Sequence, residues 1–523
     1  MIPWILILIV FILVISYTFG QLAKIRGLIV DSLTRAQEES FWQSILYYLL
    51  VAGFLVLLDV SKRFTEDRLI LKLRRTVNID LLTRYLSFNV SYRIHLFRSV
   101  DNPDQRIEED TRTFCAQTIS LFLIVVGATA TLVVQGGILF AVDKRLPWIA
   151  IAYAVVGSTL TFLVGKKLII LNWLQLMKEA NYRFKLIGIR ENSEAINFYR
   201  ENQKEQTRTR QYLREAVKNM LKIIAVNRNL GLVTGTYNQL IWIVPHLLLA
   251  GDVLLGNKTY GDIITASVAF EHFLGALSLV VSHFSNLSSY AAVVGRLGDF
   301  YEKIEHASRF STRVKPAKAV VFKNVSIYVP TEQLEIVSNL SFNHQGGGLL
   351  IIGDSGVGKS SVLRVIAGLW DSFTGEVYAP EAKESFFVPQ KPYCFEGTLL
   401  SQLLFGVKKL PSLSRVIKTA ELCGLGPTIE KHGSLNVVQD WNKVLSLGEQ
   451  QKIAWVRLFL ADRKFCFIDE MTTAVDIHFE ELFYKELSMR AYLWISVGVR
   501  ESLFKYHQVK LYLDGGGKWR LVE

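Results

Sequence analysis

The stretch GDSGVGKSS, residues 353–361, combines glycines, a lysine and hydroxyl side chains at a spacing that suits a phosphate group. It follows the apolar run LLII and precedes a helix-forming segment, so backbone N–H groups and the positive end of a helix can surround phosphate oxygens. Within it, Lys359 is expected to neutralise the β and γ oxygens of a nucleotide, and the Ser360 hydroxyl to ligate Mg²⁺. The loop residues expected to contact ATP are Gly353, Asp354, Ser355, Gly356, Val357, Gly358, Lys359, Ser360 and Ser361.

A second group of reactive side chains lies in KFCFIDEMTTAVD, residues 464–476. The apolar run predicts a buried strand that ends in Asp469 and Glu470. An aspartate at the carboxyl end of a strand beside a phosphate-binding loop is well placed to hold the water shell of Mg²⁺. The next carboxylate, Glu470, can then polarise an attacking water. An acidic turn without chemistry is the alternative, and the phosphate-binding loop argues against it.

Long uncharged segments indicate a membrane protein. Half of the 523 residues are hydrophobic, and an α-helix needs about 20 apolar residues to cross a bilayer. Six segments are predicted to span the bilayer, and they are residues 1–20, 40–58, 113–142, 146–165, 229–251 and 263–295. The first has no Lys or Arg ahead of its apolar run, which argues against a cleaved signal peptide. The last contains one acidic residue, Glu271, which either lines a cavity or proton path or lies in interfacial water.

The charged loops predict the orientation. Residues 62–112 hold eleven Lys or Arg, and residues 166–228 are also strongly basic. Basic loops stay cytoplasmic, so both loops and the C-terminal half are expected inside, in a bacterial inner membrane or an organellar membrane. This topology accounts for the net charge of +12 without a nucleic-acid partner. The four scattered cysteines predict reduced thiols, since no pair has the CxxC spacing of a metal or redox site.

The segment order predicts an all-α six-helix transmembrane domain followed by an α/β P-loop ATPase domain. The transmembrane domain is expected over residues 1–310, a basic linker over 311–319 and the ATPase domain over 320–523, where short apolar runs alternate with helical stretches. Residues 166–228 are rich in charge, yet their apolar residues recur at the spacing of an α-helix. They are expected to extend two spans into the cytoplasm with a short turn at the tip.

The segment LSLGEQQ, residues 445–451, resembles the signature of ATP-binding cassette (ABC) proteins. The resemblance implies that Ser446 and Gly448 contact the γ-phosphate of a nucleotide. Around it, FVPQKPYCFEG resembles the Q-loop of the family, which gives Gln390 a catalytic and Mg²⁺-sensing role, and TTAVD resembles its D-loop with Asp476. Tyr328 in SIYVP occupies the position where the family often stacks an aromatic ring on adenine, although a lone tyrosine in a strand is more often a packing residue.

The membrane half narrows this resemblance. DNPDQRIEED (101–110) and IRENSEAINFYRE (189–201) are similar to segments of subfamily D half-transporters and their bacterial relatives, which have an exporter-like (type IV) fold. The resemblance implies a head-to-tail pair, formed with a second copy or a related half-transporter, that binds ATP between a P-loop and the other chain's signature. The solute would be amphipathic or hydrophilic, such as cobalamin, a peptide or an acyl compound. Loop tips 92–110 and 190–201 would couple the domains.

Three loop charges, Asp104, Arg106 and Glu194, are candidates for that coupling. The alternative is that they are ordinary solvated charges, which the residues by themselves favour.

Val499 departs from the family pattern. The strand that normally ends SVGHR reads SVGVR over residues 496–500, and the nearest histidines, His478 and His507, do not occupy the motif position. The missing histidine would hydrogen-bond the γ-phosphate, and losing one such contact costs on the order of 10²–10³ in rate. Two interpretations stay open. In the first, ATP hydrolysis is slow, and the chain is either a transporter or a regulatory subunit that pairs with an active partner. In the second, Glu470 alone sustains near-normal hydrolysis.

Overall fold

The computed structural model describes residues 1–278, 284–310, 312–472 and 474–523. The chain divides into two compact units. The helical unit comprises Met1–Arg84 and Asn102–Glu302, and the sheet unit comprises Tyr85–Asp101 and Lys303–Glu523. The domain limits expected at residues 310 and 320 stay predictions, and the first linker residue, Ser311, lies outside the described residues.

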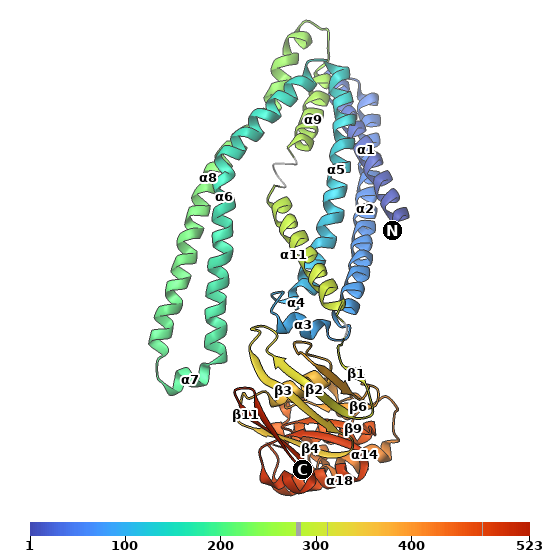
Figure 1. Ribbon diagram of the computed structural model, residues 1–523. Helices are drawn as coiled ribbons and strands as arrows, with labels where there is room; N and C mark the ends of the chain where they lie inside the picture. The colour runs from blue at the N-terminus through green and yellow to red at the C-terminus, as the bar shows by residue number, and fades with distance from the viewer. Residues whose placement is uncertain (279–283, 311, 473) are drawn as a thin grey trace. The chain divides into compact units, whose positions relative to one another are not determined.

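The helical unit contains a helix over each of the expected spans (Figure 1). Its long helices are α1 (Ile2–Thr34), α2 (Glu38–Tyr85), α5 (Thr111–Val142), α6 (Leu146–Glu191), α8 (Asn202–Leu254), α9 (Tyr260–Leu277) and α11 (Phe284–Ser308). The sixth expected span is represented by α9 and the start of α11, and its residues 279–283 lie outside the described residues. The C-terminal end of α11 enters the range of the sheet unit.

Four of the described helices are long and apolar enough to cross a membrane by length and composition. They are α1, α2, the continuous helical segment Pro103–Val142, and α6. The other two expected spans, α8 and α9, do not meet this measure. Polar side chains in the apolar part of α8, and Asp262, Glu271 and His272 in α9, account for their lower hydropathy.

Two of these helices form the long hairpin that the sequence predicts. Helices α6 and α8 run side by side and are joined at their tip by the short helix α7 (Ser193–Phe198) (Figure 1). Asn219 Nδ2 donates to the Leu171 carbonyl at 2.9 Å, and Lys178 pairs with Glu215 at 3.2 Å. Polar contacts therefore hold the charged part of the hairpin together where apolar packing is sparse.

Short helices occupy the segment between α2 and α5. They are α3 (Val90–Leu96), α4 (Pro103–Gln105) and one π-helical turn (Arg106–Asp110). The π-helical turn leads directly into α5, and Arg296 of α11 pairs with Asp110 at 2.5 Å. This ion pair fixes the lower end of α5 to α11 within the helical unit.

The sheet unit is built on a six-stranded sheet of order β12-β11-β4-β10-β9-β6. Its strands are β4 (Gly347–Gly353), β6 (Ser385–Val388), β9 (Phe465–Asp469), β10 (Leu493–Val497), β11 (Val509–Gly515) and β12 (Lys518–Val522). All are parallel except β12, which pairs antiparallel with β11. Parallel strands are covered on both faces, which explains their nearly continuous apolar sequences.

A second sheet of order β1-β5-β2-β3 and a β7–β8 ribbon complete the strands of the described residues. Their bounds are β1 (Lys315–Pro316), β2 (Val320–Tyr328), β3 (Glu335–His344), β5 (Glu376–Ala379), β7 (Glu396–Thr398) and β8 (Val438–Asp440). The helices are α12 (Lys359–Ile366), α13 (Leu399–Leu403), α14 (Leu413–Leu422), α15 (Gly426–His432), α16 (Trp441–Val444), α17 (Leu447–Ala461), α18 (Ile477–Arg490) and the 3₁₀ helix Glu501–Tyr506.

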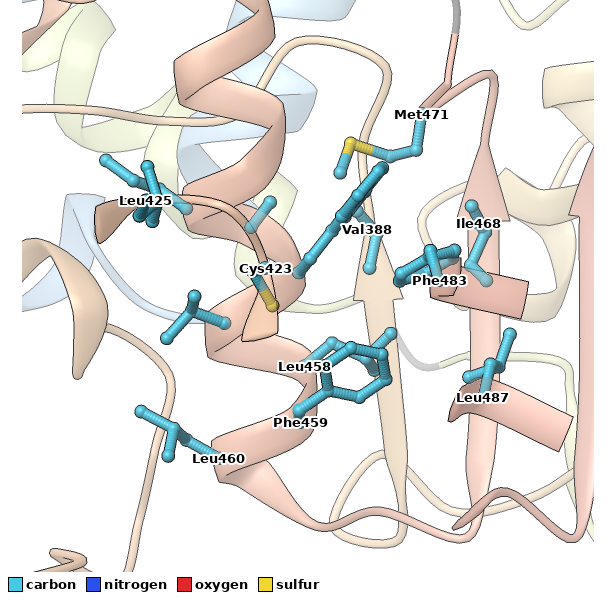
Figure 2. Close-up of a cluster of buried hydrophobic side chains, with 14 of the residues drawn as sticks. Val388, Cys423, Leu425, Leu458, Phe459, Leu460, Ile468, Met471, Phe483 and Leu487 are labelled. Atoms are coloured by element: carbon cyan, nitrogen blue, oxygen red, sulfur yellow. The ribbon is translucent and has the colours of Figure 1, made fainter. Parts of the chain in front are cut away.

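An apolar core joins α17 and α18 to the sheet. Figure 2 shows Phe459 of α17, Ile468 of β9 and Phe483 of α18 within this buried cluster. The apolar interior makes the ends of β9 and β10 rigid supports for the polar residues that follow them.

All four cysteines are free and buried. Burial raises the pKa of the Cys394, Cys423 and Cys466 thiols. The expectation of reduced thiols stays a prediction.

Candidate functional site

The carboxyl edge of the six-stranded sheet brings the predicted nucleotide residues together. Val497 at the end of β10 is in register with Ile351 of β4 on one side and with Asp469 of β9 on the other. The phosphate-binding loop follows β4, and the acidic pair lies at the end of β9. The position of Val499 therefore lies between them, at the edge where ligands of open α/β sheets bind.

The phosphate-binding loop has the backbone that its glycines allow. Gly356 and Gly358 adopt φ angles of 86° and 102°, which side chains other than glycine rarely accept. Gly358 also caps α12, and a Cβ atom there would lie 3.3 Å from Val337 Cγ2. The Lys359 ammonium is buried and donates to the carbonyls of Gly353 and Asp354, both at 2.8 Å. The lysine is thus held across the loop, where it can meet phosphate oxygens.

The acidic pair contacts the loop directly. Ser360 Oγ donates to Asp469 Oδ1 at 2.9 Å. Burial raises the pKa of Asp469, and this hydrogen bond opposes the rise. Hydroxyl and carboxylate oxygens are ligands that Mg²⁺ prefers, with phosphate and water completing its shell. In the described residues no group of three His, Cys, Asp or Glu side chains gathers to form an all-protein metal centre. The Ser360 hydroxyl and the Asp469 carboxylate fit an Mg²⁺ ion that also binds phosphate oxygens.

Glu470 is held by two of the predicted site residues. Gln390 Nε2 donates to Glu470 Oε2 at 2.9 Å, and Lys359 Nζ lies 3.6 Å from Glu470 Oε1. The Glu470 backbone has a φ of 43°, an uncommon value for a residue with a side chain, and its N–H donates to the Val497 carbonyl at 3.1 Å. Strain of this kind tends to occur at functional sites. The geometry turns the carboxylate toward the loop and the Q-loop amide.

Val499 is an exposed apolar residue at this polar edge. Its side chain is 62% exposed. It follows Gly498, whose N–H donates to the Ile351 carbonyl at 3.2 Å and so continues the pairing of β10 with β4. The sheet register supports the assignment of Val499 to the histidine position of the family.

The nearest histidines lie elsewhere. His507 precedes β11, whose first residue pairs with Leu349, so it lies at the amino edge of the sheet. It is buried, its Nδ1 lies 2.8 Å from the Leu503 carbonyl, and burial lowers its pKa to about 4. His478 is exposed on the first turn of α18. Neither occupies the position of Val499.

A buried carboxylate, Glu480, organises the turn after Val499, and sequence reasoning did not find it. Glu480 is 0% exposed and pairs with Arg500 Nη1 at 3.2 Å, while the Ser502 hydroxyl donates to its other oxygen. Arg500 Nη1 also donates to the Val475 carbonyl at 3.2 Å. The only sequence signal is a glutamate four residues after Asp476, which suggests a helix face and no particular partner.

The signature segment begins a helix. Ser446 and Glu449 form a reciprocal capping box at the start of α17, and the Thr428 hydroxyl also donates to Glu449 at 2.9 Å. Burial raises the pKa of Glu449, but its hydrogen bonds to Ser446 and Thr428 outweigh burial and lower it. Ser446 is exposed. The positive end of a 15-residue helix beside an exposed hydroxyl suits an anion.

The signature and the D-loop are packed against each other. A Cβ atom on Gly448 would lie 2.9 Å from the Ala474 carbonyl, so glycine permits this approach. Gln451 Oε1 accepts from the Ala474 N–H at 3.2 Å. Asp476 caps α18 by accepting from the Phe479 N–H at 3.0 Å. Its predicted nucleotide role stays a prediction beside this structural one.

Tyr328 ends β2 near the phosphate-binding loop. It is half-buried, and its backbone N–H donates to the Ser372 carbonyl at 2.8 Å. It pairs with Glu335 across the sheet, and the next residue, Ile336, lies 3.4 Å from the position of a Cβ on Gly358. The strand end is therefore near the loop, and adenine stacking stays a prediction.

The first part of the loop tip 92–110, up to Asp101, belongs to the sheet unit. Trp370 Nε1 donates to the Tyr92 hydroxyl of α3 at 2.9 Å, and Arg93 pairs with Asp371 at 3.4 Å. Asn89 Nδ2 donates to the carbonyls that follow α12, at Gly368 and Leu369. These contacts attach residues 85–101 to the nucleotide-binding fold.

The three proposed coupling charges lie in the helical unit. Asp104 and Glu194 are exposed, and Arg106 is buried in the π-helical turn. Their coupling role stays a prediction.

Fold and site together define a membrane-bound P-loop ATPase, with a helical membrane domain and one nucleotide-binding domain in a single chain. Comparison with known proteins specifies the class. The family model described as ABC transporter transmembrane region 2 matches residues 2–254, and the model described as ABC transporter matches residues 337–473.

Full-length relatives agree. The chain is 33% identical over 509 residues to an uncharacterised ABC transporter ATP-binding protein of a Synechocystis species, covering 94% of this chain and 77% of the relative. It is 30% identical over 551 residues to the chloroplastic ABC transporter D family member 2 of Arabidopsis thaliana. This match covers 91% of this chain and 78% of the relative. It is 29% identical to the lysosomal cobalamin transporter of Mus musculus, and this match covers 88% of this chain and 83% of the relative.

A solved bacterial Atm1-family ABC exporter with ATP bound has the same fold, with a TM-score of 0.75, 19% identity, and coverage of 98% of this chain and 93% of the other. The chain belongs to the ABC transporter family. Its organisation is that of the half-transporters of subfamily D and their bacterial relatives.

Proposed function

We propose that this chain is an ATP-driven transporter that acts as a dimer and hydrolyses ATP slowly. The observation that carries the proposal is the contrast at one sheet edge. Lys359 and Gln390 both contact Glu470 beside the phosphate-binding loop, while Val499 presents an apolar side chain where the family has a histidine.

Each residue of the nucleotide site has a separate proposed role. The N–H groups of the loop and Lys359 bind the β and γ phosphates, and Ser360 with Asp469 would hold Mg²⁺. When bound, this ion neutralises charge on the phosphate oxygens. Glu470 is the general base that orients and deprotonates the attacking water. Gln390, which already donates to Glu470, positions that carboxylate and senses the metal.

Two chains are proposed to bind ATP between them. Ser446 is exposed at the start of α17, on a different element from the phosphate-binding loop, so a second chain can present its own signature to the nucleotide. The partner is a second copy or a related half-transporter. Closure of the pair would act on the loop tips 92–110 and 190–201.

The solute is proposed to be amphipathic or hydrophilic, with cobalamin, a peptide or an acyl compound as the chemical classes. The relatives support transport across a bilayer, since one is a chloroplastic ABC transporter and another is a lysosomal cobalamin transporter. We place the chain in a bacterial inner membrane with the nucleotide-binding domain in the cytoplasm. An organellar membrane is the alternative, for which the chloroplastic relative is the argument.

The deciding experiment measures Mg²⁺-dependent ATP hydrolysis by the purified protein in lipid nanodiscs. Val499→His is expected to raise turnover by about 10²-fold, because it restores one positioned contact to the γ-phosphate. Glu470→Gln is expected to abolish hydrolysis while nucleotide binding persists. Native turnover that is already fast, and unchanged in Val499→His, would contradict slow hydrolysis.

A regulatory subunit that pairs with an active ABC partner is the second candidate. The exposed valine favours it too, because such a subunit needs ATP binding without fast turnover. Purifying the chain with its natural partner, and assaying transport, distinguishes the transporter from the regulatory subunit. A homodimer that moves solute with ATP supports the transporter, whereas activity that appears only with a different half-transporter supports the regulatory subunit.

A further inference from the structure

A cavity of about 750 Å³ lies among α1, α2, α5 and α9 in the helical unit. Its volume falls within the range of small-molecule sites. Apolar side chains such as Ile12, Ile15 and Leu123 form much of its wall, and Phe19 lies beside His272 with ring centroids 5.2 Å apart. The wall therefore suits an organic molecule with aromatic or aliphatic surface.

The charged side chains of the cavity wall differ in whether they form ion pairs. On α2, Asp59 pairs with Arg63 at 2.9 Å, and Lys62 lies 3.9 Å from Glu66, which also accepts from the Ser120 hydroxyl at 3.3 Å. These carboxylates already have cationic partners.

Glu271 on α9 differs from them. Within the described part of the chain it forms no ion pair closer than 4.0 Å. Among the wall carboxylates in the described residues, Glu271 is the one with no Lys or Arg nitrogen within that distance.

Glu271 is the twelfth residue of α9, about 17 Å along the helix from Tyr260, because a helix rises about 1.5 Å per residue. Its side chain is exposed, so a ligand in the cavity can reach it. Carboxylates within membrane-spanning segments tend to line cavities or pathways.

A second polar group opens to the same cavity. Ser16 on α1 is 5% exposed and lines the wall, so its hydroxyl can contact a ligand in the cavity.

We propose that this cavity binds an amphipathic organic cation, with Glu271 as the counter-ion, Ser16 as a polar contact and Phe19 as part of the apolar surface. The inference deepens the proposed transport function by giving the solute a charge, and it rests on that function only for the statement that the bound cation is transported. A cation would be attracted to the Glu271 carboxylate, whereas an anionic solute would be repelled by it.

The test uses two ions of nearly the same size and opposite charge. Saturable binding of radiolabelled tetraphenylphosphonium to the native protein in phosphatidylcholine nanodiscs is measured without ATP, with empty nanodiscs as the background. Tetraphenylborate is added as competitor. The cation is expected to bind saturably, and the anion is expected not to displace it.

Variants assign the binding to the carboxylate. Glu271→Gln is expected to weaken tetraphenylphosphonium binding at least about tenfold, because it removes the opposite charge that attracts the cation at short range. Glu271→Asp, which keeps the charge, is expected to stay within about threefold of the native protein. The matched control Glu39→Gln, at the exposed start of α2, is expected to bind as the native protein does. Thermal unfolding of each variant checks that the fold is retained.

Three results would overturn the proposal: no saturable cation binding, equal competition by tetraphenylborate, or unchanged affinity in a folded Glu271→Gln variant. Failure of the transport function is a separate outcome. Saturable, Glu271-dependent binding without ATP-driven movement of the cation would leave the cation site standing and contradict transport of this ion.

Discussion

At the carboxyl edge of the six-stranded sheet, Lys359, Asp469 and Glu470 lie at or just beyond strand ends and are close to one another or to the phosphate-binding loop. At the amino edge, two histidines are buried instead. His344 Nε2 lies 3.1 Å from the Gly347 carbonyl, and His507 packs against the aromatic ring of Tyr484. Burial lowers the pKa of both histidines.

The contrast shows that position on the sheet decides what an ionisable residue can do. A histidine at the carboxyl edge would face phosphate and water, whereas at the amino edge it is kept neutral by packing. These two histidines lie at the edge where they cannot act on a nucleotide, and a valine lies at the edge where the family has a histidine. The two edges therefore make opposite predictions for substitution.

The largest effect is expected at the carboxyl edge. Lys359→Ala removes the buried ammonium that crosses the phosphate-binding loop, and ATP turnover is expected to fall by about a thousandfold because preorganised charge at the phosphates is lost. Hydrolysis in nanodiscs and binding of a fluorescent ATP analogue measure the two consequences. The control Lys408→Ala changes an exposed lysine outside the site. Equal losses in both variants would mean that the position of Lys359 has no special role.

An intermediate effect on stability is expected at Glu480, the buried glutamate of α18 that pairs with Arg500 in the turn after Val499. Glu480→Ala leaves the Arg500 cation without its carboxylate, which is expected to lower the free energy of unfolding by about 3 kcal/mol. Hydrolysis is expected to fall as well, since Arg500 also binds the Val475 carbonyl in the D-loop.

The matched control lies on the same helix. Glu486 forms a partly exposed pair with Arg490 at 3.0 Å, and Glu486→Ala is expected to cost less than about 1 kcal/mol. Denaturant unfolding of the full chain and the ATPase assay compare the two variants. A Glu480→Ala protein with native stability and native turnover would refute the role given to this residue.

The smallest effect is expected at the amino edge and depends on pH. Because the pKa of His507 falls from 6.5 to about 4 on folding, the unfolded chain binds a proton that the folded chain does not. This group then lowers the free energy of unfolding as the pH falls from neutral, by about 2 kcal/mol at pH 5. His507→Gln should reduce that dependence and leave ATP turnover unchanged. Lost hydrolysis in His507→Gln would contradict the division between the two edges.

Strands and tight loops fix the direction of a side chain within a few residues, so short motifs can indicate which side chains meet at this edge. Lys359, Ser360, Asp469, Glu470 and Gln390 form the contacts described above, and their roles toward a nucleotide stay predictions. The order of an all-α membrane domain followed by an α/β P-loop domain was predicted as well. These features depend on short stretches of sequence.

Features that depend on long-range packing were missed. The ion pair between Glu480 and Arg500 joins a helix to a turn twenty residues later, and no spacing rule connects them. The attachment of Tyr92 to Trp370 joins residues far apart in the chain. The cavity around Glu271 depends on how four helices pack, so the sequence indicated an unusual charge and not its surroundings.

The four buried thiols make the native chain suitable for site-specific labelling. Maleimide and nitroxide reagents react with accessible thiolates, which Cys394, Cys423 and Cys466 do not offer because burial raises their pKa. A single cysteine introduced at the exposed position 499 would therefore carry the only reactive thiol among residues that the structure describes. A spin label there would report the separation of two nucleotide sites in a dimer as ATP is added, without removing any natural cysteine.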